Sequence, residues 1–121
     1  ATLTVYPPLG EDGSNERGLV FLCSAGDYDL LITGDINAET EQLLLERCGL
    51  PDIEALVVGH HGSQYSTSAE LLDALRPETA FISVGSNSYG HPNEQVLARL
   101  AERGITIYRT DLQGSLRLSV G

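Results

Sequence analysis

The sequence predicts an α/β fold in which helices cover one or both faces of a sheet. Strand-like apolar runs alternate with amphipathic stretches of helical length in the middle of the chain, an order typical of layered α/β domains. The 121 residues suffice for one domain with a hydrophobic core and are too few for two ordinary ones. Residues 1–121 are therefore expected to form a single domain.

The first third of the chain is predicted to form three strands. Residues 3–6 alternate as a strand does and end at two prolines, and a polar, glycine-rich loop follows at 10–18. Residues 19–23 and 28–33 are β-type runs that flank a short turn at 25–27. Because the turn is so short, these two strands should pair antiparallel.

Three helices are predicted from their end signals. Asn37 is expected to cap the first helix, and residues 67–70 resemble a capping box that opens the second. Pro92 suits the first position of the third helix, and Gly104 suits the position just after its end. Each helix carries an apolar face that can pack against a sheet.

Further strands are predicted between and after the helices. Residues 53–58 and 79–84 are apolar runs of strand length. Residues 105–108 and 115–120 are expected to close the chain as a hairpin around a turn at 111–114.

Composition excludes several classes of protein. A net charge of −10 with only seven Lys and Arg argues against a surface that grips nucleic acid unaided, so a polyanionic substrate would need bound divalent cations or a basic neighbouring domain. No apolar run approaches the length of a membrane span, and no signal peptide pattern is visible. Cys23 and Cys48 lack metal-type spacing and are expected to be small buried hydrophobes.

Polar residues that support chemistry follow three of the predicted strands. Asp35 comes after residues 28–33, His60 and His61 come after 53–58, and His91 follows 79–84 by a short loop. Ligands of open α/β sheets bind beyond the carboxyl ends of the strands. The sequence therefore predicts that these residues share one rim of the sheet.

Each of these residues also has a purely structural explanation. Asp35 is either a partner for a helix N-terminus or a metal ligand, and Gly34 before it allows close approach. His60 and His61 should point to opposite faces unless the chain turns, which Gly62 permits; one imidazole can then bind a cation while the other contacts a phosphate or donates a proton. Alternatively, the two histidines cap the next helix.

Ser63 and His91 complete the candidate residues. Ser63 belongs to a group of hydroxyls for which helix capping is a sufficient explanation, and no GxSxG elbow supports a nucleophilic serine. His91, if it is the N-cap before Pro92, would be held as a neutral imidazole by the positive helix end, able to bind metal or to donate one hydrogen bond. Plain capping is the alternative.

Five short motifs occur in an order that points to one family. They are TGD at 33–35, HHGS at 60–63, SVG at 83–85, YGHP at 89–92 and RTD at 109–111. With their flanking residues they resemble the metallo-β-lactamase-type domain at the C-terminus of ComEC, the competence DNA-uptake channel protein of bacteria. The resemblance covers most of residues 29–118. It implies a four-layer αββα sandwich, of which this chain would be the C-terminal αβ half.

The resemblance also implies roles for the candidate residues. Asp35 would bridge two divalent metal ions, Zn or Mn, and His60 would be the imidazole ligand, with His61 as the alternative ligand. His61, Ser63 and His91 would line the pocket near the scissile phosphate as catalytic residues. No small-molecule organic cofactor is implied.

The chain departs from the family pattern at two places. Gly18 stands where relatives usually carry a serine, and the histidine- and aspartate-rich motif that holds the first metal, HxHxDH or HxDxDH, is missing from the sequence. A hydrolytic metal site needs three or more protein ligands. The half that carries this motif is therefore expected to come from upstream sequence or from another chain, and this chain alone is expected to be inactive or nearly so.

The function that the resemblance implies is that of a metal-dependent phosphodiesterase or nuclease in a competence protein, degrading the DNA strand that is not transported. Its partners would be DNA and the channel and DNA-binding domains of a polytopic protein of the bacterial inner membrane, with this soluble domain on the extracytoplasmic face. Two alternatives remain at this point: a non-catalytic module that binds a partner or caps a channel, and a metallo-hydrolase acting on another phosphoester or a lactone.

Overall fold

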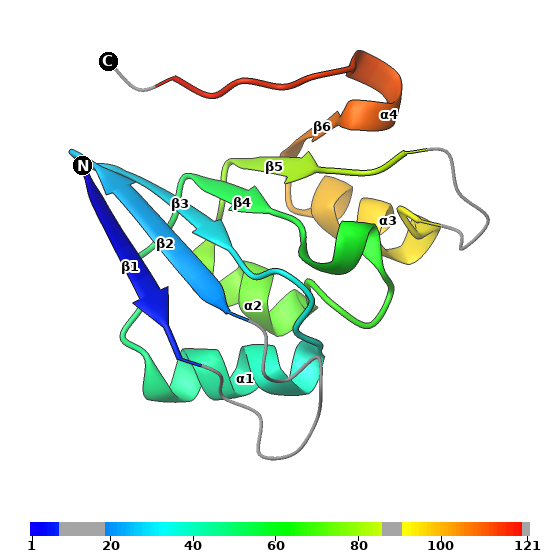
Figure 1. Cartoon of the computed structure of the whole chain (residues 1–121). Helices are drawn as coiled ribbons and strands as arrows, with labels where there is room; N and C mark the ends of the chain where they lie inside the picture. Colours follow the sequence, from blue (N-terminus) through cyan, green and yellow to red (C-terminus); the bar gives the residue numbers. More distant parts are fainter. Residues whose placement is uncertain (8–18, 86–90, 120–121) are drawn as a thin grey trace.

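The computed structural model describes residues 1–7, 19–85 and 91–119 and contains a six-stranded sheet whose strands follow the order of the sequence. Helices pack against the sheet, so the predicted α/β layered class is confirmed (Figure 1). The predicted loop at 10–18 lies outside the described residues. No helix among the described residues is long and apolar enough to cross a membrane.

The sheet is antiparallel at one side and parallel at the other. Its strands are β1 (Thr2–Tyr6), β2 (Val20–Ala25), β3 (Tyr28–Ile32), β4 (Ala55–Val57), β5 (Thr79–Ile82) and β6 (Thr106–Arg109). Strands β1 to β3 form an antiparallel meander, as predicted for β2 and β3, while β3 to β6 are parallel. The parallel pairs occur where a helical connection returns the chain to the same end of the sheet.

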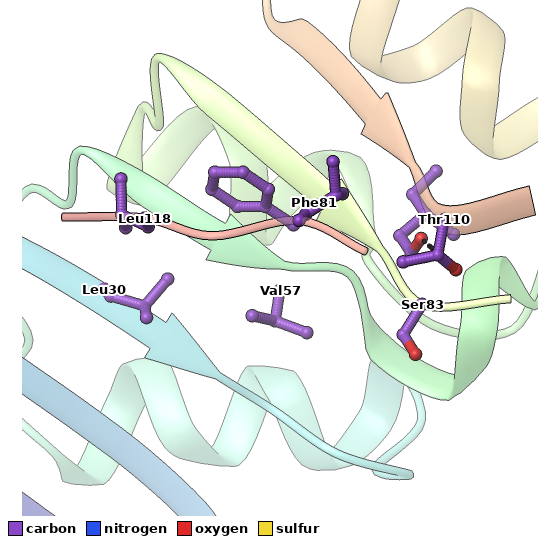
Figure 2. A pocket seen from close by; sticks show the side chains of 8 residues that line it. Leu30, Val57, Phe81, Ser83, Thr110 and Leu118 are labelled. Carbon is purple, nitrogen blue, oxygen red and sulfur yellow. Dashed lines mark hydrogen bonds between the residues drawn. The ribbon is translucent and has the colours of Figure 1, made fainter. Parts of the chain in front are cut away.

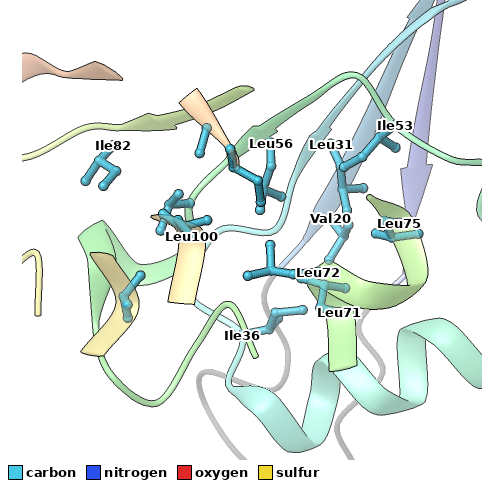
Figure 3. Close-up of a cluster of buried hydrophobic side chains, with 14 of the residues drawn as sticks. Val20, Leu31, Ile36, Ile53, Leu56, Leu71, Leu72, Leu75, Ile82 and Leu100 are labelled. Atoms are coloured by element: carbon cyan, nitrogen blue, oxygen red, sulfur yellow. The ribbon is translucent and has the colours of Figure 1, made fainter. Parts of the chain in front are cut away.

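The helical elements are α1 (Ala38–Arg47), the 3₁₀ turn η1 (Gly59–Gly62), α2 (Ala69–Leu75), α3 (Glu94–Glu102) and α4 (Thr110–Gln113). Helices α1, α2 and α3 lie on the same face of the sheet (Figure 1). Their inward leucines and valines meet alternate residues of the strands in one apolar core (Figure 3). Large members of this core are Val20, Leu31, Leu44, Leu56, Leu71, Leu72, Ile82, Val96 and Leu100.

The opposite face of the sheet carries an apolar row that no described helix covers. At one level of the register every strand contributes an apolar side chain, and the row reads Val5, Phe21, Ile32, Val57, Phe81 and Tyr108. Val5 and Tyr108, at its two ends, are 49% and 38% exposed. We call this surface the open sheet face. The described chain after α4 crosses it, and Leu118 lines a groove of about 300 Å³ there with Leu30 and Phe81 (Figure 2).

The predicted terminal hairpin is wrong. Residues 110–113 form α4, and no strand follows among the described residues up to 119. The backbone N–H of Arg109 bonds to the side chain of Gln113, which favours a helical turn. Leu116 and Leu118 do alternate, but their shared side packs on the open sheet face instead of marking a hydrogen-bonded strand.

The predicted helix ends are confirmed for α1 and corrected for α2 and α3. Asn37 caps α1, accepting from the N–H of Thr40 at 3.0 Å. Ser68, not Thr67, is the N-cap of α2. Asn93 is the N-cap of α3, because its side chain reaches the N–H of Gln95 at 2.8 Å.

Helix α3 consequently begins two residues later than predicted. Pro92 is not its first residue, and His91 is not its cap. Gly104 was predicted to follow the end of α3, and this prediction is confirmed. Its φ of 69° is the left-handed value expected of a glycine just after a helix.

The two cysteines are less enclosed than predicted. Both are free thiols of intermediate exposure, so neither is fully buried. Cys23 pairs in register with Leu3 and Leu30 on the open sheet face, while Cys48 packs at the edge of the core.

Candidate functional site

The carboxyl ends of β3, β4 and β5 bring three loops to one edge of the sheet. Because these strands are parallel and adjacent, each is followed by its loop at the same edge. The backbone N–H of His60 donates to the carbonyl of Gly34 at 2.7 Å, which joins the loop after β4 to the loop that carries Asp35. The N–H of Asn93 donates to the carbonyl of Gly62 at 2.8 Å, which brings in the segment that carries His91.

The histidine pair itself makes the turn after β4. His60 and His61 have φ values of 51° and 54°, and Gly62 follows with 88°. Left-handed backbone costs an ordinary residue about 1–2 kcal/mol and is concentrated at functional sites. Sequence reasoning assigned the turn to Gly62 alone, because nothing in the residue pattern distinguishes a left-handed histidine from a right-handed one.

Gly62 is required by close contact as well as by φ. A Cβ at this position would lie 2.6 Å from Cβ of Pro92, closer than such atoms approach. Gly59 is similarly confined, since a Cβ there would lie 2.9 Å from Oγ1 of Thr33. The described parts of the loops after β3, β4 and β5 are thus in close contact at Gly59 and Gly62.

The left-handed turn sends the two imidazoles in different directions. The ring of His60 meets the ring of His91 edge to face, with 5.9 Å between centroids. Nδ1 of His61 lies 2.6 Å from the carbonyl oxygen of Ser83, just after β5. The two rings therefore have different partners, both of which belong to the loop region after β5.

Asp35 and Ser63 differ sharply in exposure. Asp35 is exposed and is not the N-cap of α1, since Asn37 takes that position. Ser63 is only 4% exposed, and its Oγ accepts a hydrogen bond from the N–H of Tyr65 at 3.3 Å. This contact holds the turn after η1 and turns the hydroxyl inward.

Neighbouring hydroxyls also hold this loop in place. Oγ of Ser66 donates to the carbonyl of Ile36 at 2.7 Å, and Oγ1 of Thr67 accepts from the N–H of Gly59 at 3.0 Å. Together with the cap formed by Ser68, these contacts confirm a structural role for the hydroxyls after the histidine pair.

Glu41 is a residue whose role the sequence did not reveal. Its carboxylate is fully buried in α1 and accepts from the N–H groups of Thr67 at 2.5 Å and Ser68 at 2.9 Å. Burial raises the pKa of Glu41, while these hydrogen bonds and the nearby charge of Arg99 act in the opposite direction. Its spacing of three residues from Leu44 placed it on the inward helix face, and that was the available signal.

Arg99 of α3 fastens the same loop from the other side. Its guanidinium donates to the carbonyl of Thr67 at 2.7 Å and more weakly to that of Ser66 at 3.4 Å. Glu41 and Arg99 therefore hold the chain between the histidine pair and α2 by its N–H and its carbonyl groups, respectively.

The candidate donors form only part of a metal site. Within residues 1–7, 19–85 and 91–119, no group of three or more His, Cys, Asp and Glu side chains could hold a metal ion. One buried polar atom beneath the loops is also unsatisfied in this part of the chain: Oγ1 of Thr33, next to Gly59. The rim presents a carboxylate and imidazoles, but a complete ligand set is not assembled by these residues.

The fold and rim define an α/β layered protein with a histidine-bearing edge beyond its parallel strands. No family model matches the chain. It is 40% identical over 109 residues to "Competence protein ComA" of Neisseria gonorrhoeae, covering 88% of this chain and 16% of that protein. It is also 40% identical over 106 residues to "ComE operon protein 3" of Bacillus subtilis, with shares of 85% and 13%.

"Recombination protein 2" of Haemophilus influenzae is 37% identical over 106 residues, with shares of 87% and 13%. The chain is therefore a homologue of a short segment of proteins named for competence or recombination. It spans only 13% to 16% of the length of these curated relatives.

Proposed function

We propose that this chain belongs to a competence DNA-uptake protein of the ComEC kind and forms the C-terminal αβ half of its metallo-β-lactamase-like domain. The observation that carries the proposal is the similarity to two competence proteins at 40% identity over 85% or more of the chain. The ordered motifs from TGD to RTD lie within the segment that resembles this family.

The open sheet face supports the proposed αββα arrangement. An apolar row that crosses all six strands favours burial against a second layer, because exposed apolar area of this extent is unfavourable in water. In an αββα domain this layer is the sheet of the other half. The complete domain would thus bury the side of the sheet opposite α1, α2 and α3.

Asp35 and His60 are proposed as ligands for divalent metal ions, Zn or Mn. Carboxylate oxygen and imidazole nitrogen suit both metals, and the hydrogen bond from His60 to Gly34 ties the two ligand loops together. Asp35 and His60 would supply some of the ligands of a site for two metal ions. The histidine- and aspartate-rich motif in the other half of the αββα domain would supply the rest. When bound, such ions supply a water of lowered pKa and stabilise the charge of a phosphodiester under attack.

The other rim residues are proposed to position the phosphate and move protons. His91 lies against His60 and so sits beside the proposed ligand, while His61 is oriented by Ser83. Either imidazole could protonate the leaving oxygen. Ser63 would contribute to the pocket wall near the phosphate, although its hydroxyl is engaged by Tyr65.

The proposed substrate is DNA, specifically the strand that is not transported during uptake. A net charge of −10 gives this chain little attraction for phosphates, so the metal ions and a DNA-binding domain of the same membrane protein would supply it. The domain is proposed to lie on the extracytoplasmic face of the inner membrane.

The test is a calorimetric titration of the intact protein with Zn²⁺ or Mn²⁺, followed by assays of single-stranded DNA cleavage. Asp35→Ala should weaken metal binding by at least about tenfold and abolish cleavage. Asp27→Ala, in the exposed turn between β2 and β3, is the matched control and should change neither. Separate His60→Ala and His61→Ala variants identify the ligand imidazole.

Three outcomes would count against parts of this proposal. Absence of metal binding would favour a non-catalytic module that binds a partner or caps a channel. Metal binding that survives Asp35→Ala would remove Asp35 from the site. Cleavage of small phosphodiesters or lactones without cleavage of DNA would keep the metal site and reject the substrate.

A further inference from the structure

Thr110, in the RTD motif, makes a hydrogen-bonding arrangement that the proposed metal site does not explain. Its Oγ1 accepts from the N–H of Val84 at 2.8 Å and donates to the carbonyl of Val84, also at 2.8 Å. The carbonyl of Ile82 lies 3.5 Å away. One side chain thus satisfies both backbone groups of Val84, the second residue past the end of β5.

The hydrogen bonds of Thr110 continue the contact between β5 and β6 beyond the last backbone pair, with a side chain in place of a strand residue. The regular ladder between these strands ends at the pair of Ile82 and Arg109. Helix α4 begins directly after Arg109, so the backbone beyond Arg109 cannot continue the pairing with β5. The hydroxyl of Thr110 instead bonds to both backbone groups of Val84 and so ties the segment after β5 to the start of α4. Figure 2 shows Thr110 beside Ser83, the residue before Val84.

Thr110 is itself held firmly at the start of α4. The guanidinium of Arg109 is paired with the carboxylate of Asp111 through two hydrogen bonds of 3.0 and 2.7 Å. The backbone N–H of Arg109 donates to Oε1 of Gln113 at 2.6 Å. All three residues of the RTD motif therefore act on the geometry of one short segment beside the rim.

The segment so held presents the carbonyl of Ser83 to His61. Nδ1 of His61 lies 2.6 Å from that oxygen, and a carbonyl can only accept a hydrogen bond. Nδ1 must therefore carry the hydrogen. In the neutral ring the lone pair is then on Nε2, the nitrogen that points away from this bond.

We propose that Thr110 is a positioning residue: by fixing the Ser83 carbonyl, it locks His61 in the tautomer with hydrogen on Nδ1 and the lone pair on Nε2. The proposal rests on the proposed function for the importance of His61. Nε2 is the atom that His61 would use either to bind a metal ion or to exchange a proton with a phosphate ester. A backbone carbonyl on the other nitrogen is the usual means of orienting such an imidazole.

The test measures the tautomer directly in the metal-free chain of residues 1–121 labelled with ¹⁵N histidine. Long-range ¹H–¹⁵N correlation spectra are recorded at a pH where the imidazoles are neutral. His61 should show a protonated Nδ1 and an unprotonated Nε2. Thr110→Val, which keeps the shape but lacks the hydroxyl, should lose this preference and show a mixture of tautomers.

Two variants make the comparison specific. Thr110→Ser retains the hydroxyl and should restore the wild-type spectrum. Thr106→Val, at an exposed threonine of β6, the strand before Thr110, should leave it unchanged. Hydrogen exchange of the Val84 amide should be faster in Thr110→Val than in the wild type, because its bond to Oγ1 is lost.

If the wild-type spectrum shows a neutral His61 with its hydrogen on Nε2, the proposal is overturned by that spectrum alone. An unchanged tautomer in a folded Thr110→Val chain would overturn it as well; Thr110→Ala serves if the valine variant fails to fold. Because no metal is present, these outcomes are independent of the titration that tests Asp35. If the intact protein binds no metal but His61 still carries its hydrogen on Nδ1, the proposed function is rejected and the positioning role of Thr110 is retained.

Discussion

Glu41 is the residue at which burial and charge conflict most strongly in the described part of the chain. Its carboxylate is fully buried, yet it supplies acceptors to two consecutive N–H groups where the chain enters α2. Burial favours the protonated acid and the hydrogen bonds favour the carboxylate, and the net effect raises the pKa of Glu41.

This raised pKa makes the contribution of Glu41 to stability depend on pH. Since the folded chain holds the proton more tightly than the unfolded chain, stability falls as pH rises from the usual value of 4.5 through the folded pKa. The difference in unfolding free energy between wild type and Glu41→Gln should therefore be most favourable to the wild type in acid and level off above this window. Urea unfolding of both chains from pH 4 to 8, roughly spanning the transition, measures it.

Comparing the two chains cancels the titration of the other carboxyl groups. Glu39→Gln, on the exposed first turn of the same helix, is the matched control and should show no such dependence. A difference for Glu41→Gln that is independent of pH, or that grows as pH rises, would contradict the assignment.

Replacing Gly62 should destabilise the fold for two reasons, its left-handed backbone and the lack of space for a side chain. An alanine would suffer a positive φ of 88° and a Cβ 2.6 Å from Pro92. Gly104 has a positive φ of 69° but open space, so Gly104→Ala should cost only the backbone term of about 1–2 kcal/mol. Gly62→Ala should cost a further ~1–3 kcal/mol for overpacking, measured by urea unfolding. Equal losses for the two variants would show that the loops after β4 and β5 are not tightly packed.

The candidate residues were predictable from the sequence to different extents. The rule that ligands gather beyond parallel strands was enough to place the segments carrying Asp35, His60 and His91 at one edge. The directions of the two imidazoles were not predictable, because they depend on the sign of φ at His60 and His61. Glu41 and Thr110 were missed because their polar atoms act on backbone groups far away in the sequence.

At the scale of elements, the helix starts show which local rules decide a boundary. Asn93 and Pro92 both signal a helix start, and the observed N-cap is Asn93, whose side chain can satisfy a free N–H group of the first turn. The same rule correctly assigned Asn37 to α1. At the start of α2, two neighbouring residues, Thr67 and Ser68, can act as the cap. The hydroxyl of Thr67 accepts a hydrogen bond from Gly59 instead, and Ser68 caps the helix.

The cap of α3 can be tested by a pair of substitutions. Asn93→Ala should destabilise the chain by about 1 kcal/mol, because the N–H of Gln95 loses its acceptor. Asn93→Asp keeps an acceptor and adds a charge favoured at a helix N-terminus, so it should be neutral or slightly stabilising. Thermal unfolding of the three chains measures both effects. If the two variants lose equal stability, Asn93 acts through something other than its capping oxygen.

The C-terminal segment shows why alternation is an ambiguous signal. Leu116 and Leu118 follow the period of two that predicts a strand, but that period reports only an extended chain with one apolar side. Such a side can pack on a sheet face as well as within a sheet. What distinguishes the two cases is the pairing of backbone groups, which side-chain patterns do not encode.

At the scale of the whole molecule, the two faces of the sheet differ: the helices α1, α2 and α3 cover one face, and no helix among the described residues covers the other. The buried face carries residues such as Leu31 and Leu56, with no more than 1% exposure. The open sheet face is equally apolar along its central row, yet its ends at Val5 and Tyr108 remain accessible. This apolar row is the feature of the sheet on which the proposed second layer depends.

This asymmetry predicts opposite responses to substitution on the two faces. Leu3→Thr with Val5→Thr, both on exposed positions of β1, should change stability by less than about 1 kcal/mol in the chain of residues 1–121. The same pair should reduce binding of a dye that fluoresces on apolar surfaces, because the dye would bind to the open sheet face. Leu31→Ala, on the buried face, should cost about 2–5 kcal/mol. Urea unfolding and dye titration of the same samples measure both responses.

The intact protein should reverse the first of these results. If a second sheet covers the open sheet face, dye binding should be weak from the start, and Leu3→Thr with Val5→Thr should now lower stability because both side chains are buried between layers. Strong dye binding by the intact protein that the two substitutions abolish would mean that this face stays exposed. The proposed αββα arrangement would then be wrong, whatever the metal titration shows.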